Sequence, residues 1–247
     1  HPELPGTRDD QEADRKLRRS LSTAMYETLE IERAGKIATI WMNRPAVLNA
    51  FDEQLIAELA ATCAELDADA SVRVVVLAGR GKHFSAGADL NWMKRASQFT
   101  HEQNVEDARK FANMLRTLSE MSKPTIARVQ GAALGGGTGL TAACDMAIAS
   151  SDAVFSTSEV KFGIIPSAIS PYVLRAIGPR HALRYFQSAE RISAERALTI
   201  GLVGEVVPLA ELDASIGKLV DALLQGGPQA QKAAKDLIVT VNGKTID

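Results

Sequence analysis

One segment, residues 124–145, limits the possible folds of this chain more than any other. Five of the nine residues from 131 to 139 are glycine, and the residues 125–129 before them are short, β-branched and opened by a proline. This pattern predicts a strand at 125–129, and the alanine-rich residues 140–143 predict a helix. A strand that turns through glycines into a helix directs free main-chain N–H groups at one point, where the helix dipole favours negative charge. The segment therefore predicts a seat for an anion or an oxyanion.

Two familiar phosphate-binding motifs are excluded by the spacing of these glycines. A Walker A loop has the separation of Gly131 and Gly136 but requires a lysine where Gly137 stands. A dinucleotide fingerprint begins with Gly135 and Gly137, but Leu140 replaces its third glycine. On the glycines alone, a turn that merely packs a helix close to a sheet is the favoured interpretation. The rest of the chain changes that interpretation.

The composition is that of an ordinary globular chain with one sizeable core, because 46% of the 247 residues are hydrophobic and 23% are charged. A net charge of −2 indicates neither nucleic acid nor an anionic membrane as a partner. No apolar run approaches the ~20 residues of a membrane span. Cys63 and Cys144 lie far apart, so we expect buried thiols in a reducing cytoplasm. The four histidines form no ligand pattern, so we expect no metal site.

The predicted elements alternate between strands and helices after a charged N-terminal tail. Residues 1–24 mix acids and bases with few apolar residues, so we expect a disordered or tag-like tail. We expect strands at 26–33, 36–42, 72–77, 125–129, 144–150, 153–156 and 203–207, with a hairpin turn at 34–35. We expect helices at 52–66, around 92–93, and at 101–120, 140–143, 172–177, 179–188, 193–200, 209–224 and 228–241.

A second loop of small residues follows the predicted buried strand at 72–77 and opens the next helix. It ends in Ser85-Ala-Gly-Ala88-Asp89. Two such loops after neighbouring parallel strands would each contribute one N–H group, and the two groups would lie on either side of a single oxygen atom. An oxyanion hole of this kind stabilises a reaction that builds charge on a carbonyl oxygen.

One carboxylate, Glu159, follows on a loop with apolar neighbours such as Phe155 and Phe162. Apolar surroundings raise the pKa of a carboxyl group, as a general acid or base requires. Standing alone, Glu159 would be interpreted as a solvated loop acid. Ser85 and His83 invite a nucleophile–base interpretation, but no Gly-x-Ser-x-Gly elbow surrounds Ser85.

Several motifs stand in one order over residues 26–241. They are Asn43-Arg-Pro with Asn49-Ala, Phe84-Ser-Ala-Gly-Ala-Asp89, Lys123-Pro-Thr, Gly131-x-Ala-x-Gly-Gly-Gly, Cys144-Asp145, and Phe155-x-x-x-Glu159 with Gly163-Ile-Ile-Pro166. With this set the chain resembles the crotonase (enoyl-CoA hydratase/isomerase) superfamily. The resemblance implies an α/β fold, a ClpP/crotonase-like spiral of ββα units at 25–207, with a C-terminal helical oligomerisation region at 208–247.

The resemblance also implies a site for an acyl-CoA thioester, with coenzyme A as part of the substrate and no other cofactor. The N–H groups of Ala88 and Gly136 would form the oxyanion hole, and Glu159 would act as general acid and base. The remaining substrate-binding residues implied are the main chain of Ser85, Ala86, Asp89 and Leu90 around adenine, together with Gly135, and Arg44 near the CoA phosphates with Lys82.

Gly139 departs from the family, because many hydratases carry a first catalytic glutamate at that position. The run from Glu159 to Val173 resembles methylglutaconyl-CoA hydratase-like members, which act on branched, carboxylated enoyl-CoAs in leucine and acyclic-terpene breakdown. We therefore favour a hydratase. Two alternatives stay open: an isomerase with one glutamate, and an acyl-CoA-binding relative without turnover.

The C-terminal region gives two further expectations. Family members usually continue for several tens of residues beyond Asp247, so we expect a truncated or disordered end. An apolar stripe on the predicted helix at 209–224 requires a cover, and the family assembles as trimers or dimers of trimers. We therefore expect a homo-oligomer with threefold symmetry.

Overall fold

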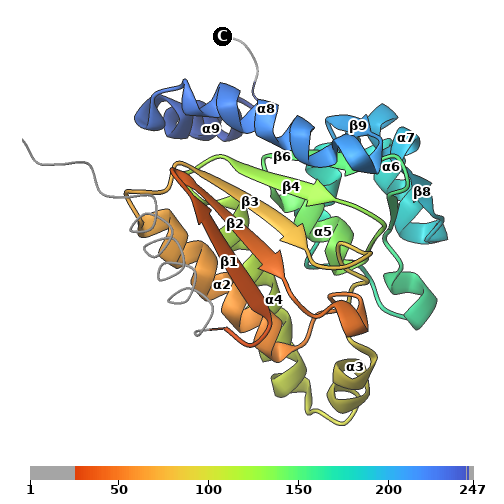
Figure 1. The fold of residues 1–247 in the computed structure, drawn as a ribbon. Coiled ribbons are helices and arrows are strands. Elements are labelled where there is room, and N and C mark those ends of the chain that lie inside the picture. The colour runs from red at the N-terminus through yellow and green to blue at the C-terminus, as the bar shows by residue number, and fades with distance from the viewer. Residues whose placement is uncertain (1–25, 243, 245–247) are drawn as a thin grey trace, which may run out of the picture.

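A β-hairpin opens the described part of the computed structural model, which comprises residues 26–242 and 244 (Figure 1). Strands β1 (Leu29–Ala34) and β2 (Ile37–Met42) pair antiparallel, with Ala34 opposite Ile37. The turn is therefore formed by residues 35 and 36, one residue later than predicted, and Gly35 takes a φ of +59°. The predicted tail at 1–24 lies outside the described residues.

The hairpin forms one edge of a six-stranded sheet in the order β1-β2-β3-β4-β6-β9. From β2 onward all neighbours are parallel. The remaining strands are β3 (Val74–Gly79), β4 (Thr125–Val129), β6 (Met146–Ser150) and β9 (Glu205–Val207). Every residue of β3 is buried, as its β-branched run predicts.

Helices cover both faces of this sheet (Figure 1). Val75 and Leu77 of β3 face a core shared with α2 (Glu53–Ala68) and α4 (His101–Ser119). Asp52 and Thr100 cap these two helices by accepting hydrogen bonds from the N–H groups of Leu55 and Gln103. The alternate residues of β3 face the other side of the sheet, where α8 (Leu212–Leu224) packs.

The apolar stripe of α8 is covered within the same chain. Leu212, Ile216 and Val220 pack against Val74, Val76, Ile126 and Ile148 of the sheet. Leu209, in the 3-10 helix η3 (Leu209–Glu211), remains 50% exposed. The apolar stripe of α8 is therefore no argument for a partner chain, because these side chains are already buried against the sheet.

A second, three-stranded sheet has the order β5-β7-β8 and was missed in part by the sequence. Its members are β5 (Ala132–Leu134), β7 (Val154–Ser156) and β8 (Ile192–Ser193). Only β7 lies in a predicted strand. β5 is hidden inside the glycine-rich segment, where three residues give no periodic pattern.

The other α-helices overlap the predicted ones, although α5 begins four residues earlier than predicted, and two further 3-10 helices were not predicted. They are α3 (Leu90–Ala96), α5 (Gly136–Ala143), α6 (Ser170–Ser188), α7 (Ala194–Thr199) and α9 (Pro228–Val241), with 3-10 helices η1 (Pro45–Val47) and η2 (Glu159–Phe162). Gly178, with a φ of +72°, divides α6 into the two predicted pieces. Within the part of the chain that is described, no helix is long and apolar enough to cross a membrane.

Candidate active site

The loop Ser85–Asp89 is fixed to its surroundings on both sides through main-chain hydrogen bonds. The Ser85 N–H donates to Ala132 O (3.0 Å), and Ser85 O accepts from Leu134 N–H (2.9 Å), so this residue bridges to β5. Farther along, Phe51 O accepts from Asp89 N–H (2.8 Å). These bonds hold the residues on either side of Ala88, whose own N–H has no acceptor among residues 26–242 and 244.

The second loop uses Gly135 to turn from β5 into α5. Gly135 has φ +51° and ψ −114°, a conformation that other residues resist. Its N–H donates to Ser156 O (2.7 Å), and its carbonyl accepts from Gly139 N–H (3.1 Å), which starts the helix. The N–H of Gly136 at the first helical position therefore lacks an acceptor within the described chain.

The two loops touch so closely that neither could carry side chains at the contact. A Cβ on Gly87 would lie 2.8 Å from Leu134 O, and one on Gly137 would lie 2.5 Å from Ser85 O. Ala88 and Gly136 are the chain neighbours of these contact points. The two loops meet as predicted, but the second leaves β5 of the smaller sheet and not β4, the parallel neighbour of β3.

Glu159 lies beside the N-terminus of α5. Its Oε1 atom is 3.4 Å from the position that a Cβ on Gly135 would occupy. Burial raises the pKa of the Glu159 carboxyl group, as the sequence predicted. Its Oε2 atom is buried and has no hydrogen-bond partner among the described residues. A buried carboxylate oxygen without a partner is costly, so this group is poised for a proton, a water or a substrate.

The position of the family's first glutamate is closed in this chain. A Cβ on Gly139 would overlap Cγ2 of Ile169 and lie 2.8 Å from its Cβ. Ile169 is 1% exposed and belongs to the main core. The site therefore has one carboxylate at this helix, and Ile169 fills the room that a second would need.

Aromatic rings form the wall behind Gly136. Phe51 and Phe111 lie 5.5 Å apart between ring centroids, and both would touch a Cβ on Gly136. The sequence missed this pair because Phe111 was not assigned to the inner face of α4. That face is formed by Phe111, Met114, Leu115 and Leu118.

Arg44 braces three segments around the first loop. Its guanidinium lies 2.8 Å from Asp52 and 3.2 Å from Asp89, and also donates to Ala50 O. Partial burial alone would raise the pKa of Asp89, but N–H donors of Asn91 and Trp92 and the charge of Arg44 lower it. Phosphate binding by Arg44 stays a prediction, and these two carboxylates compete with it.

The expected adenine-binding main chain is only partly available. Both polar main-chain groups of Ser85 pair with β5, and Ala86 N–H donates to Leu48 O (2.9 Å). Leu90 is 66% exposed and Lys82 is exposed. His83 is no base for Ser85, because its Nδ1 accepts from Ala132 N–H (3.0 Å) while Ser85 Oγ donates to Asn49 O (2.8 Å).

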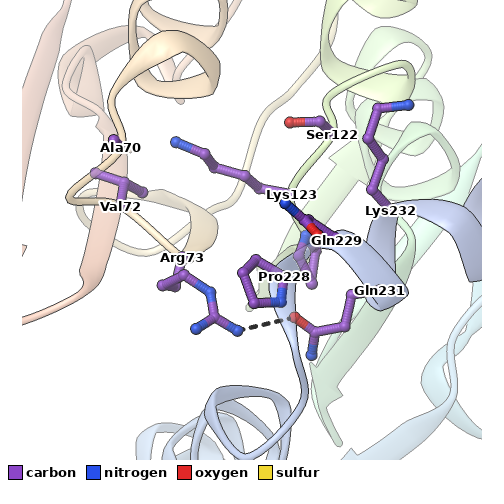
Figure 2. Close-up of a pocket in the computed structure, with 10 residues that line it drawn as sticks. Ala70, Val72, Arg73, Ser122, Lys123, Pro228, Gln229, Gln231 and Lys232 are labelled. Carbon is purple, nitrogen blue, oxygen red and sulfur yellow. Dashed lines mark hydrogen bonds between the residues drawn. The ribbon is translucent and has the colours of Figure 1, made fainter.

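Two hollows lie away from these residues. One of about 310 Å³ is bordered by Arg73, Lys123 and the start of α9 (Figure 2). Its cations are already engaged, since Lys123 donates to Leu66 O (2.6 Å) and Arg73 to Gln231 Oε1 (3.2 Å). The larger, about 980 Å³, lies between the C-terminal end of α5, β6 and α9.

Cys63 and Cys144 are buried free thiols, as predicted, and burial raises the pKa of both. In the described ranges, no group of three or more His, Cys, Asp or Glu side chains could hold a metal ion.

Comparison with known proteins identifies the family. The sequence matches the enoyl-CoA hydratase/isomerase family over residues 32–244. The short-chain-enoyl-CoA hydratase of Clostridium acetobutylicum is 37% identical, over 84% of this chain and 79% of that protein. Among solved structures, an enoyl-CoA hydratase from Shewanella pealeana is 38% identical with a TM-score of 0.89, covering 93% of this chain and 86% of the other. A protein assigned as an enoyl-CoA hydratase/isomerase (crotonase) from Legionella pneumophila is 47% identical, with a TM-score of 0.86 and coverages of 89% and 85%.

These structural matches confirm the predicted crotonase-type α/β fold. The family match spans most of the chain, and the relatives exceed 30% identity over most of their length. The chain is therefore a member of the enoyl-CoA hydratase/isomerase family of enzymes, the crotonase superfamily.

Proposed function

We propose that this protein adds water across the double bond of an α,β-unsaturated acyl-CoA thioester. One observation carries the proposal: Glu159, with a buried and unpartnered carboxylate oxygen, lies beside the N-terminus of α5, where the Gly136 N–H has no acceptor. The relatives named as hydratases support the same reaction.

In the proposed mechanism the thioester oxygen lies between the N–H groups of Ala88 and Gly136. These donors stabilise the enolate-like charge that develops as water attacks C3. Glu159 takes one proton from the water and delivers one to C2, so that H and OH add across the double bond. Close packing of the loops keeps both donors in place before the substrate arrives, which lowers the cost of reorganisation.

For the acyl group we propose a branched, carboxylated chain of the methylglutaconyl type, as in leucine breakdown. The support is the sequence run from Glu159 to Val173, which resembles hydratases of such substrates. The buried, unpaired thiols of Cys63 and Cys144 support a reducing compartment such as the cytoplasm.

We also propose a threefold homo-oligomer, on different grounds from the sequence. Helix α9 has no buried residue, and its large apolar side chains are exposed: Leu237, Ile238, Val239 and Val241. Exposed apolar patches of this kind mark protein interfaces. Light scattering at micromolar concentration tests the proposal, and a monomer would contradict it.

The catalytic proposal is tested by following the absorbance of the conjugated enoyl thioester with linear, branched and carboxylated substrates. Mass analysis of the product distinguishes the candidates, because hydration adds the mass of one water. A site with one carboxylate, in which Ile169 fills the room at Gly139, favours a second candidate, isomerisation, which would move the double bond without a change in mass. Binding without either change would identify an acyl-CoA-binding relative and contradict both.

A further inference from the structure

The hydroxyl group of Ser158 is free, although its two preceding neighbours are anchored. Ser156 Oγ donates to Ala189 O (3.2 Å) and Thr157 Oγ1 to Tyr185 O (2.8 Å). Ser158 stands at the N-cap of η2, where a serine usually caps the helix, but its side chain makes no capping bond. Its Oγ therefore has no hydrogen-bond partner within residues 26–242 and 244.

This hydroxyl group and the Glu159 carboxylate lie close to the same side of Gly135. The position that a Cβ on Gly135 would occupy lies 3.6 Å from Ser158 Oγ and 3.4 Å from Glu159 Oε1. Apart from Gly135 and its two chain neighbours, atoms of Ser158 and Glu159 are the nearest to that point. The hydroxyl group and the carboxylate therefore lie near each other at the N-terminus of α5, where the Gly136 N–H has no acceptor within the described chain.

Water addition with one carboxylate leaves the attacking water incompletely held. A water has two hydrogens, and Glu159 removes only one of them. At the position where the family's first glutamate would hold the other, Ile169 presents an apolar side chain. Ser158 Oγ can accept a hydrogen bond and has no other partner among the described residues, and Ser158 directly precedes the catalytic carboxylate residue in the chain.

We infer that Ser158 is the positioning residue for the attacking water, which rests on the hydratase function proposed above. Ser158 Oγ accepts a hydrogen bond from the O–H that remains on the product. The water's other proton passes to Glu159 as the C3–O bond forms and the π bond breaks. Glu159 returns a proton to C2, and Ser158 itself gains and loses no covalent bond.

The test compares Ser158→Ala with Ser158→Thr on the best enoyl-CoA substrate of the wild type. One hydrogen bond to the water predicts that Ser158→Ala lowers kcat about tenfold, with KM within about twofold. Ser158→Thr keeps a hydroxyl at the same place and restores most of the rate. The melting temperature of both variants stays near the wild-type value, because the hydroxyl has no protein partner to lose.

Thr157→Val is the matched control, since it removes a hydroxyl that anchors the same segment to Tyr185 O. It lowers the melting temperature by a few degrees and leaves kcat within about twofold. A wild-type kcat in Ser158→Ala overturns the inference while the hydratase function stands. A loss of kcat that threonine does not restore, or that Thr157→Val reproduces, assigns a structural role and also overturns it. A wild type that hydrates no enoyl-CoA overturns both proposals.

Discussion

The two ends of helix α5 are packed in opposite ways. At the N-terminal end, a Cβ on Gly136 would lie 2.6 Å from the Phe51 ring, and one on Gly137 only 2.5 Å from Ser85 O. At the other end, Thr141, Ala142 and Cys144 border the cavity of about 980 Å³ beneath α9. One short helix thus begins in tightly packed surroundings and ends beside a cavity.

The two ends are packed differently because only the N-terminal end presents main-chain groups that must be held in place. The N-terminal end presents main-chain N–H groups, which have no rotamers of their own and are positioned only by close packing of the backbone around them. The C-terminal end has no such group to aim. There α9 is held to the body by polar contacts of Lys235 and Gln231 instead of buried side chains. Catalysis should therefore be sensitive to changes at one end of α5 and stability modestly sensitive at the other.

The largest effect is expected from Glu159→Gln at the crowded end. The amide keeps the shape of the side chain but cannot transfer a proton, so kcat should fall by about 10²–10⁴. Glu205→Gln, at the exposed first residue of β9, is the matched control and should leave kcat unchanged. Steady-state kinetics measure both, and an unchanged rate in Glu159→Gln would falsify the mechanism.

The pH profile sharpens the same prediction. The raised pKa of Glu159 means that kcat/KM falls as pH is lowered through it, because hydration needs the ionised base. The stability that Glu159 contributes is present below its unfolded pKa and is lost as pH rises through the folded value. Glu159→Gln should therefore be slightly more stable than the wild type at neutral pH. It should also lack the acidic limb of the profile.

The next largest effect is expected at Gly136. Gly136→Pro removes the N–H donor but also adds a Cβ against Phe51. Gly136→Ala adds the same Cβ and keeps the N–H, so the ratio of the two rates removes the effect of the Cβ and leaves that of the lost donor and the proline ring. Loss of an oxyanion donor costs about 10²–10³ in kcat, and proline should fall below alanine by that factor. Equal rates in the two variants would exclude this N–H from the reaction.

Gly139→Glu should destabilise the fold without creating a better hydratase. The new side chain meets Ile169 at once, and overpacking of a core typically costs about 1–3 kcal/mol. Adding Ile169→Ala shortens the obstructing side chain and should recover part of the loss. Urea denaturation measures both changes. If the single variant hydrated linear enoyl-CoAs faster than the wild type, the glutamate would have reached the site and the packing argument would be wrong.

The surroundings of Gly139 show what the sequence could not predict. Its departure from the family pattern is visible in the sequence, but Ile169, thirty positions away, is a contact that only folding reveals. The same holds for Arg44, whose partners Asp52 and Asp89 are far apart in the chain. Glu159 and the two loops were predictable because glycines, helix starts and buried strands leave local patterns.

The secondary-structure predictions also succeeded where the signal is local and failed where it depends on distant residues. The helix starts at Asp52 and Ser193, which cap α2 and α7, and the break at Gly178 depend on local sequence, and the structure has them where the predicted helices start and divide. Strand β5 is defined by its pairing with β7, a contact that its own sequence does not show, so the sequence missed it. The apolar stripe of α8 is covered by the sheet of the same chain, whereas the sequence assigned that role to a partner chain.

The smallest effect is expected at the hollow end, from Lys235→Ala. Lys235 lies 2.8 Å from Asp145 and also donates to Met121 O (2.8 Å), which ties α9 to the body. A partly exposed ion pair contributes about 1 kcal/mol or less, which for a chain of this size shifts the melting temperature by ~2–4 °C. Lys232→Ala, whose partner Asp236 is on the same helix, should change it less. The kcat of both variants should stay within about twofold of the wild type, because no catalytic N–H lies at this end. A tenfold loss in Lys235→Ala would show that α9 supports the active site after all, and the contrast between the two ends of α5 would not extend to function.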